Sequence, residues 1–126
     1  MSYEVKGEIL GFQDTKKVDI KEIDTLFSTM IDEANENISF TLANPFVLRD
    51  YTIDIPLDAK DLLEIDENSQ IGVYNILIIQ KPLEKSTINF LAPIIINLDK
   101  KLLTQVILDP KKHPDYGMAE TIESFK

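Results

Sequence analysis

The stretch IGVYNILII, residues 71–79, decides the fold of this chain. Apolar side chains occupy both odd and even positions along it, whereas a strand with one face in solvent alternates apolar and polar residues. We therefore expect a strand that is covered on both sides and lies in the centre of a sheet. Asn75 interrupts the run, which is shorter than the roughly 18 residues of a membrane-spanning helix.

Shorter apolar segments follow this stretch closely. They cover residues 87–91, 94–98 and 102–108, and they are separated by Pro93 and by the polar turn at residues 99–101. The links between them are too short for the crossover connection that parallel strands need. Neighbouring strands are therefore expected to be antiparallel.

Strand patterns also precede the central stretch. Residues 37–42 and 51–55 alternate apolar and polar side chains with period two, which is typical of half-buried strands. Residues 21–36 fit either a strand or a helix, and we expect a strand. The turn Asn44-Pro45-Phe46 should end the strand before it.

Two short helices complete the expected fold. One should cover residues 59–64, with Asp58 as its cap and Leu62 and Ile65 on its buried side. The other should cover residues 118–125, where Met118, Ile122 and Phe125 recur at helical spacing. The sequence thus predicts a mostly β fold, a small antiparallel β-barrel-like or sandwich domain with one or two short helices, in a single domain over residues 1–126.

Composition narrows the class of protein. The chain is 44% hydrophobic and 28% charged, and 22 acidic against 13 basic residues give a net charge of -9. Direct nucleic-acid binding is disfavoured, because affinity for phosphates comes from clustered Lys and Arg. The absence of cysteine and of a signal-peptide pattern at the N-terminus makes the cytoplasm the expected compartment.

The residues that carry catalysis are sparse. His113 is the only histidine, no cysteine is present, and no serine lies in a Gly-x-Ser-x-Gly motif. The four glycines stand far apart and form no phosphate-binding loop. We expect His113 to be a solvated loop residue, and we expect no catalytic site, no metal and no cofactor.

Two local features could bind a partner. Phe46 is either a loop anchor or an exposed contact, since aromatic residues are enriched at interaction hot spots. An acidic cluster is either a solvated surface or a surface that attracts a basic partner, and it lacks the spacing of a calcium loop. Its members are Asp58, Asp61, Glu64, Asp66 and Glu67.

A family resemblance rests on blocks distributed along most of the chain. In order they are LGF (10–12), ANPF (43–46), YTIDIP (51–56), NFLAPIIIN (89–97) and QVIL (105–108). In these blocks the sequence resembles FliW, a family of flagellar assembly factors. Its ending around Asp115 and Tyr116 is similar to the shorter members from Helicobacter and Campylobacter.

This resemblance implies a compact, barrel-like β fold without enzymatic activity. It also implies two protein partners, flagellin and the RNA-binding regulator CsrA, whose repression of flagellin translation would be relieved. The expected protein is a monomer that binds neither nucleic acid directly nor a membrane. Alternatives are an acidic accessory subunit of another enzyme or secretion complex and, third, a hydrolase.

The resemblance also suggests how the two candidate surfaces divide. CsrA is basic, so the acidic cluster at residues 58–67 is the expected contact for it. Flagellin presents amphipathic helices, so exposed apolar groups are the expected contact for flagellin. The candidates are Phe46, Val47 and Leu48.

Overall fold

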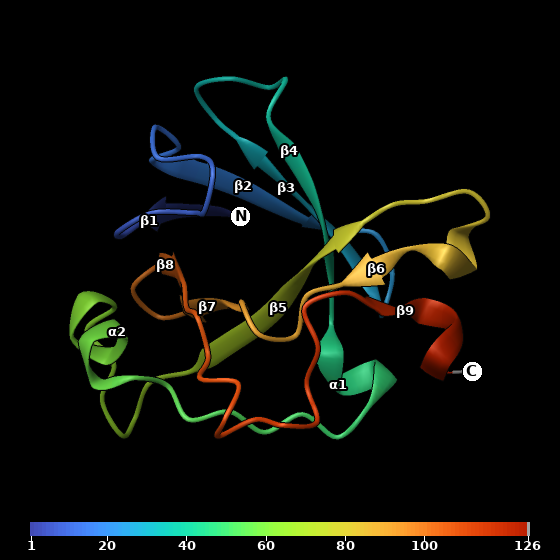
Figure 1. The fold of residues 1–126 in the computed structure, drawn as a ribbon. Coiled ribbons are helices and arrows are strands. Elements are labelled where there is room, and N and C mark those ends of the chain that lie inside the picture. The colour runs from blue at the N-terminus through green and yellow to red at the C-terminus, as the bar shows by residue number, and fades with distance from the viewer. Residues whose placement is uncertain (126) are drawn as a thin grey trace.

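The computed structural model describes residues 1–125. Within them, all strands join one sheet in the order β4-β3-β2-β1-β8-β7-β5-β6-β9, and β4 also pairs with β5 (Figure 1). The strands are β1 (Ser2–Val5), β2 (Lys17–Glu22), β3 (Phe27–Asp32), β4 (Ser39–Ala43), β5 (Ile71–Ile78), β6 (Thr87–Ile88), β7 (Ile94–Asn97), β8 (Leu102–Gln105) and β9 (Glu120–Thr121). The helices are α1 (Pro45–Leu48) and α2 (Leu57–Leu62), with 3-10 turns at Leu83–Lys85 and Ile122–Phe125.

The β4–β5 pairing closes seven strands into a barrel, which confirms the mostly β, barrel-like prediction. Strands β6 and β9 extend the sheet beyond the ring. Neighbouring strands are antiparallel as expected, except that β1 and β8 run parallel. These two strands lie far apart in the sequence, so the argument from short links does not apply to them.

Strand β5 is central, as the sequence predicts. It pairs with β4 on one edge and with β7 and then β6 on the other. Tyr74 and Ile76 pack against the barrel interior, while Val73 and Leu77 pack on the outside. The prediction of two covered faces is wrong at the end of the strand, where Ile78 is 61% exposed, because the covering layers stop before it.

The barrel interior is a closed apolar core. Alternate residues of the strands point into it, so each strand contributes one of its two faces. The fully or nearly buried members are Tyr3, Val5, Ile9, Val18, Ile20, Met30, Leu42, Ile94, Ile96 and Leu103.

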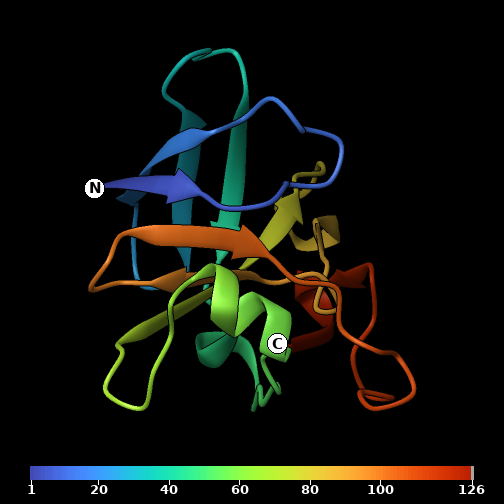
Figure 2. The same ribbon diagram turned by 90° about the vertical axis from the view of Figure 1, so that its left-hand side faces the viewer.

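A second apolar layer covers the outer face of β5, β7 and β8. Ile95 and Leu102 point out of the barrel into this layer and are buried there. In Figure 1 the green chain between α1 and α2 and the orange chain after β8 run side by side below the sheet; Figure 2 shows α2 beside them. This layer explains why β7 is buried on both faces.

Residues 51–55 belong to this layer and do not form the expected strand. The predicted alternation is present, with Tyr51 buried and Thr52 exposed. However, the amide and carbonyl of Thr52 bond to the Tyr116 hydroxyl at 2.8 and 3.0 Å and not to a neighbouring strand. The segment lies across the face of the sheet, where no strand edge is available to it.

Helix α2 forms close to the expected place, with a different buried side. It begins at Leu57 after Pro56, so Asp58 lies in the first turn and is not the cap. Ala59 and Leu63 are buried, whereas Leu62 is 46% exposed. The expected packing of Leu62 was therefore wrong, although Ile65 packs against the second layer as predicted.

The expected helix at residues 118–125 is wrong. Met118 is 69% exposed, strand β9 pairs with β6, and only a 3-10 turn follows. Ile122 and Phe125 still pack in a further apolar cluster, with Ile88 and Phe90. Pairing with β6 fixes residues 120 and 121 in an extended conformation, so the helical spacing of the apolar residues is not used.

The remaining strand predictions are mostly confirmed with shorter bounds. Residues 21–36 contain β3 and the end of β2, so the strand interpretation was right. Strand β6 stops at Ile88 because the chain turns before Pro93. Among residues 1–125, no helix has the length and apolar character needed to cross a membrane.

Candidate functional site

The turn Asn44-Pro45-Phe46 ends β4 as predicted and begins α1. The Asn44 side chain accepts a hydrogen bond from the Phe46 amide at 3.1 Å, and Pro45 occupies the first turn, where a missing N–H does no harm. Phe46 and Val47 are 57% and 54% exposed, while Leu48 is half-buried against the apolar cluster that contains Tyr51 and Phe90. We call Phe46 and Val47 the α1 ridge.

Arg49 holds the end of α1 in place. Its guanidinium lies 4.8 Å from the ring centre of Tyr116 and 5.1 Å from that of Phe90. It also pairs with Glu120 at 3.1 Å, beyond the turn that follows Tyr116. Cation–π contacts and a partly buried ion pair thus fix the α1 ridge relative to the C-terminal segment.

Tyr51 lies in the same aromatic group, where two hydrogen bonds hold its hydroxyl. Its hydroxyl donates a hydrogen bond to the Phe90 carbonyl at 2.5 Å and accepts one from Asn75 at 3.3 Å. Burial raises the pKa of Tyr51 to about 12. The phenol therefore stays protonated near neutral pH and serves as a structural donor.

The predicted acidic cluster follows the chain through α2 and the turn after it. We call Asp58, Asp61, Glu64, Asp66 and Glu67 the acidic turn; all five are exposed. The buried side chain of Asn97 donates hydrogen bonds to the carbonyls of Leu63 at 2.9 Å and Glu64 at 3.3 Å. These bonds satisfy carbonyls at the end of α2 and fix the start of the turn to the barrel.

The carboxylates of the acidic turn differ in what they contact. Glu64 pairs with Lys100 at 3.1 Å, and Asp66 accepts hydrogen bonds from Asn68 and Ser69 within its own turn. Within the described chain, no hydrogen bond or ion pair engages the carboxylates of Asp61 and Glu67. These two charges are available to a partner.

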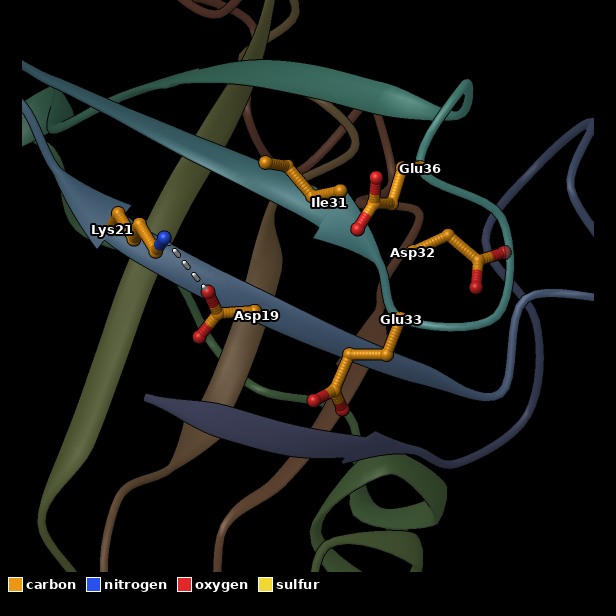
Figure 3. Close-up of a pocket in the computed structure, with 6 residues that line it drawn as sticks. All are labelled: Asp19, Lys21, Ile31, Asp32, Glu33 and Glu36. Carbon is orange, nitrogen blue, oxygen red and sulfur yellow. Dashed lines mark ion pairs between the residues drawn. The ribbon is translucent and has the colours of Figure 1, made fainter.

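A second acidic region was missed. A hollow of about 550 Å³ on β2 and β3 is lined by Asp19, Lys21, Ile31, Asp32, Glu33 and Glu36 (Figure 3). The alternation of Val18 and Ile20 with charged neighbours could have revealed β2 and placed Asp19 and Lys21 on its outer face.

Exposed apolar side chains outside α1 were also missed. Leu10, Ile78, Ile107 and Met118 are all more than half exposed. The sequence predicts Ile78 in a strand covered on both sides, Ile107 in a strand and Met118 on the docked face of a helix. Periodicity identifies which residues share a face but does not say whether that face is covered.

His113 lies in the loop after β8, as expected, but is less solvated than predicted. It is partly buried, with its ring stacked on Tyr116 at 5.7 Å between centroids and Nδ1 3.1 Å from the Asp109 carbonyl. Among residues 1–125, no three His, Cys, Asp or Glu side chains are grouped so that they could hold a metal ion.

Known proteins match this chain over nearly its whole length. A family model described as FliW protein matches residues 2–122. Flagellar assembly factor FliW 2 of Wolinella succinogenes is 46% identical, covering 99% of this chain and 92% of the relative. Flagellar assembly factor FliW of Campylobacter lari is 41% identical, with 99% and 96% coverage.

A solved structure agrees with the sequence matches. The crystal structure of a flagellar assembly factor FliW superposes with a TM-score of 0.86 at 27% identity, covering 96% of this chain and 84% of that one. The sequence matches and the shared barrel lead to one conclusion. The chain belongs to the FliW family of flagellar assembly factors.

Proposed function

We propose that this protein is a non-catalytic assembly factor that binds flagellin and the regulator CsrA in the cytoplasm, and that CsrA held by it no longer represses flagellin translation. The proposal is supported chiefly by the family match over residues 2–122. The unengaged carboxylates of Asp61 and Glu67 add a surface suited to a basic partner.

The acidic turn is the proposed contact for CsrA. A net charge of -9 on this chain and a basic surface on an RNA-binding partner give complementary fields, which accelerate encounter. Once bound beside the RNA site, the same charges would repel RNA phosphates. This protein would therefore act on RNA binding without touching RNA itself.

The α1 ridge is a proposed contact for flagellin. Phe46 and Val47 present apolar surface to solvent, and Leu48 anchors the ridge from beneath. Amphipathic helices of flagellin could cover such side chains with their apolar face. The ridge is a convex contact of two side chains, so it should contribute only part of the affinity.

Flagellin and CsrA should oppose each other on this protein. If they compete, flagellin at about 100 times its dissociation constant weakens apparent CsrA binding by roughly 2.7 kcal/mol. Export of flagellin would then free the protein to capture CsrA and restart flagellin synthesis. If they bind separate, coupled sites, the antagonism is reciprocal and saturates.

The test is a titration of purified flagellin into the preformed complex with CsrA, followed by size-exclusion chromatography. We expect co-elution of this protein with each partner alone and displacement of CsrA as flagellin increases. Full displacement indicates competition, and a plateau indicates coupling. Failure to co-elute with either partner, or a ternary complex with both affinities unchanged, would contradict the proposal.

A further inference from the structure

A separate apolar groove has neither α1 residues nor acidic-turn carboxylates in its lining. Two hollows of about 260 and 200 Å³ share Leu10, Asn89 and Met118 in their lining, so they form one groove. Leu10 and Met118 are 62% and 69% exposed. Apolar side chains gathered in a concave site are a typical feature of a binding groove.

The groove is built by segments that are far apart in the sequence. Leu10 lies in the loop after β1, Ile107 follows β8, and Leu91 lies before β7. In Figure 2 the blue loop after β1 and the orange chain after β8 both continue to the right of the view. The Gln105 side chain connects them, because its Oε1 accepts from the Leu10 amide at 2.8 Å and its Nε2 donates to the Ala92 carbonyl at 3.1 Å. The groove is thus preformed by specific hydrogen bonds.

The same segments carry the family resemblance. Blocks 10–12, 89–97 and 105–108 all contribute lining residues. Leu91 and Leu108 are buried, whereas Leu10 and Ile107 present apolar side chains to solvent beside them.

The chemistry of the lining favours a helix as the occupant. Apart from Asn89, the larger hollow is lined by apolar residues, and the Asn89 side-chain oxygen already accepts from the Leu91 amide at 3.0 Å. An extended peptide would bury backbone N–H and C=O groups against carbon without hydrogen bonds, which is costly. A helix satisfies its own backbone and needs only an apolar stripe.

Charge argues against a second copy of this chain in the groove. A third hollow that shares Ile107 with the groove is lined by Asp58, at the edge of the acidic turn. Two copies of the chain, each with a net charge of -9, would repel each other as they approach. A helix with Lys or Arg beside its apolar stripe would instead complement the edge.

We propose that this groove binds an amphipathic helix of flagellin along its apolar stripe, and that it is the main flagellin site, with the α1 ridge as a smaller contact. This inference rests on the proposed function for the identity of the partner. The inference goes beyond the proposed function because it names the binding site on this protein and the helical form of the bound flagellin segment.

The first test compares flagellin affinity by calorimetry for Leu10→Glu, Ile107→Glu and Met118→Glu. All three residues are more than half exposed, so the variants should fold, as circular dichroism would verify. Ile23→Glu is the matched control, because Ile23 is 60% exposed and lies between β2 and β3, away from the groove. We expect a loss of about 30-fold for each groove variant, the size of a hot-spot residue, and less than 2-fold for the control.

Other outcomes overturn the inference in distinguishable ways. Normal binding by the groove variants with loss in Val47→Glu would move the site to the α1 ridge and keep the proposed function. A wild-type dimer that the groove variants convert to monomers would assign the groove to a second copy. Wild-type protein that binds no flagellin at all would overturn the proposed function and this inference together.

The second test addresses the helix. A peptide spanning a terminal helix of flagellin should bind the wild-type protein and gain helical circular dichroism on binding. The same peptide with a proline in its middle should lose at least about 10-fold in affinity, because proline is strongly disfavoured at an interior helical position. Equal binding of both peptides would overturn the helical mode.

Discussion

The acidic hollow on β2 and β3 and the acidic turn after α2 carry similar residues but use them differently. In the hollow, Asp32 is only 3% exposed and accepts hydrogen bonds from the Thr15 hydroxyl and the Ala34 amide, each at 2.8 Å. Glu33 accepts one from the Ser2 hydroxyl at 2.6 Å. These carboxylates join β1, the loop before β2 and the turn after β3.

Asp19 is engaged in the same way. The N-terminal amino group lies 2.9 Å from its carboxylate and Lys21 lies 3.8 Å away, and the hydrogen bond from the amino group lowers the pKa of Asp19. By contrast, Asp61 and Glu67 in the acidic turn have no such contacts in the described chain. A partner surface is therefore better identified by unengaged charge than by acidic residues as such.

The largest effect should come from reversing charges in the acidic turn. We expect Asp58, Asp61 and Glu67, all changed to Lys, to slow association with CsrA roughly 10-fold at low salt, because the field that steers encounter is lost. Dissociation should change less. Stopped-flow measurements between ~50 and ~500 mM salt would show the difference shrinking as screening increases.

The matched control reverses Asp14, Glu22 and Glu36, which are exposed and lie outside the acidic turn. It has the same net charge, so any effect of total charge is equal in both variants. We expect the control to slow association less than about 3-fold, because steering depends on where the charges lie. Equal slowing in the two variants would contradict the proposal that the acidic turn is the contact for CsrA.

The fold was predictable where residue patterns dictate it. The two-sided apolar run of β5 and the short links after it predicted a central strand among antiparallel neighbours, and these features are present. The parallel contact of β1 with β8 was not predictable, since it joins the two ends of the chain and leaves no local pattern. Strand β1 itself is too short for a clear alternation.

The exposure of individual side chains was predictable only in part. A turn signal marked Phe46 and Val47 as candidates for exposed contacts, and both are exposed. Ile107 and Met118 were missed because an apolar residue at a strand or helix spacing predicts burial. Their exposure depends on which segments pass over them in three dimensions, and the sequence alone does not show this.

A smaller effect should come from Asp32, which belongs to the structural acids. Its pKa lies below the ordinary value because of hydrogen bonds from Thr15 and then from the Ala34 amide. A carboxyl with a depressed folded-state pKa stabilises the fold above its unfolded pKa of about 3.9, and that stability is lost as pH falls through the folded pKa.

We therefore expect Asp32→Asn to lower the free energy of unfolding by about 1–2 kcal/mol at pH 7, with the gap to wild type narrowing below about pH 4. Urea denaturation from pH 7 to pH 3 measures both. Glu36→Gln, in the same hollow but exposed, should leave stability unchanged throughout. A gap that widens with acid would mean that Asp32 is not the group being titrated.

The smallest effect concerns the one ion pair of the acidic turn among the described residues. Lys100 and Glu64 are 49% and 58% exposed, and an exposed pair at 3.1 Å contributes at most about 1 kcal/mol. Lys100→Ala should keep the local backbone conformation, because the backbone amide of residue 100 still donates a hydrogen bond to the Asn97 side chain. It also frees Glu64, so we expect nearly unchanged stability and roughly 2-fold faster association with CsrA at low salt.

Lys111→Ala changes the net charge equally in the exposed loop after β8 and should have a smaller effect. If Lys100→Ala instead slowed association, Lys100 would itself be a contact for CsrA, and the distinction between engaged and unengaged charge would fail at this position.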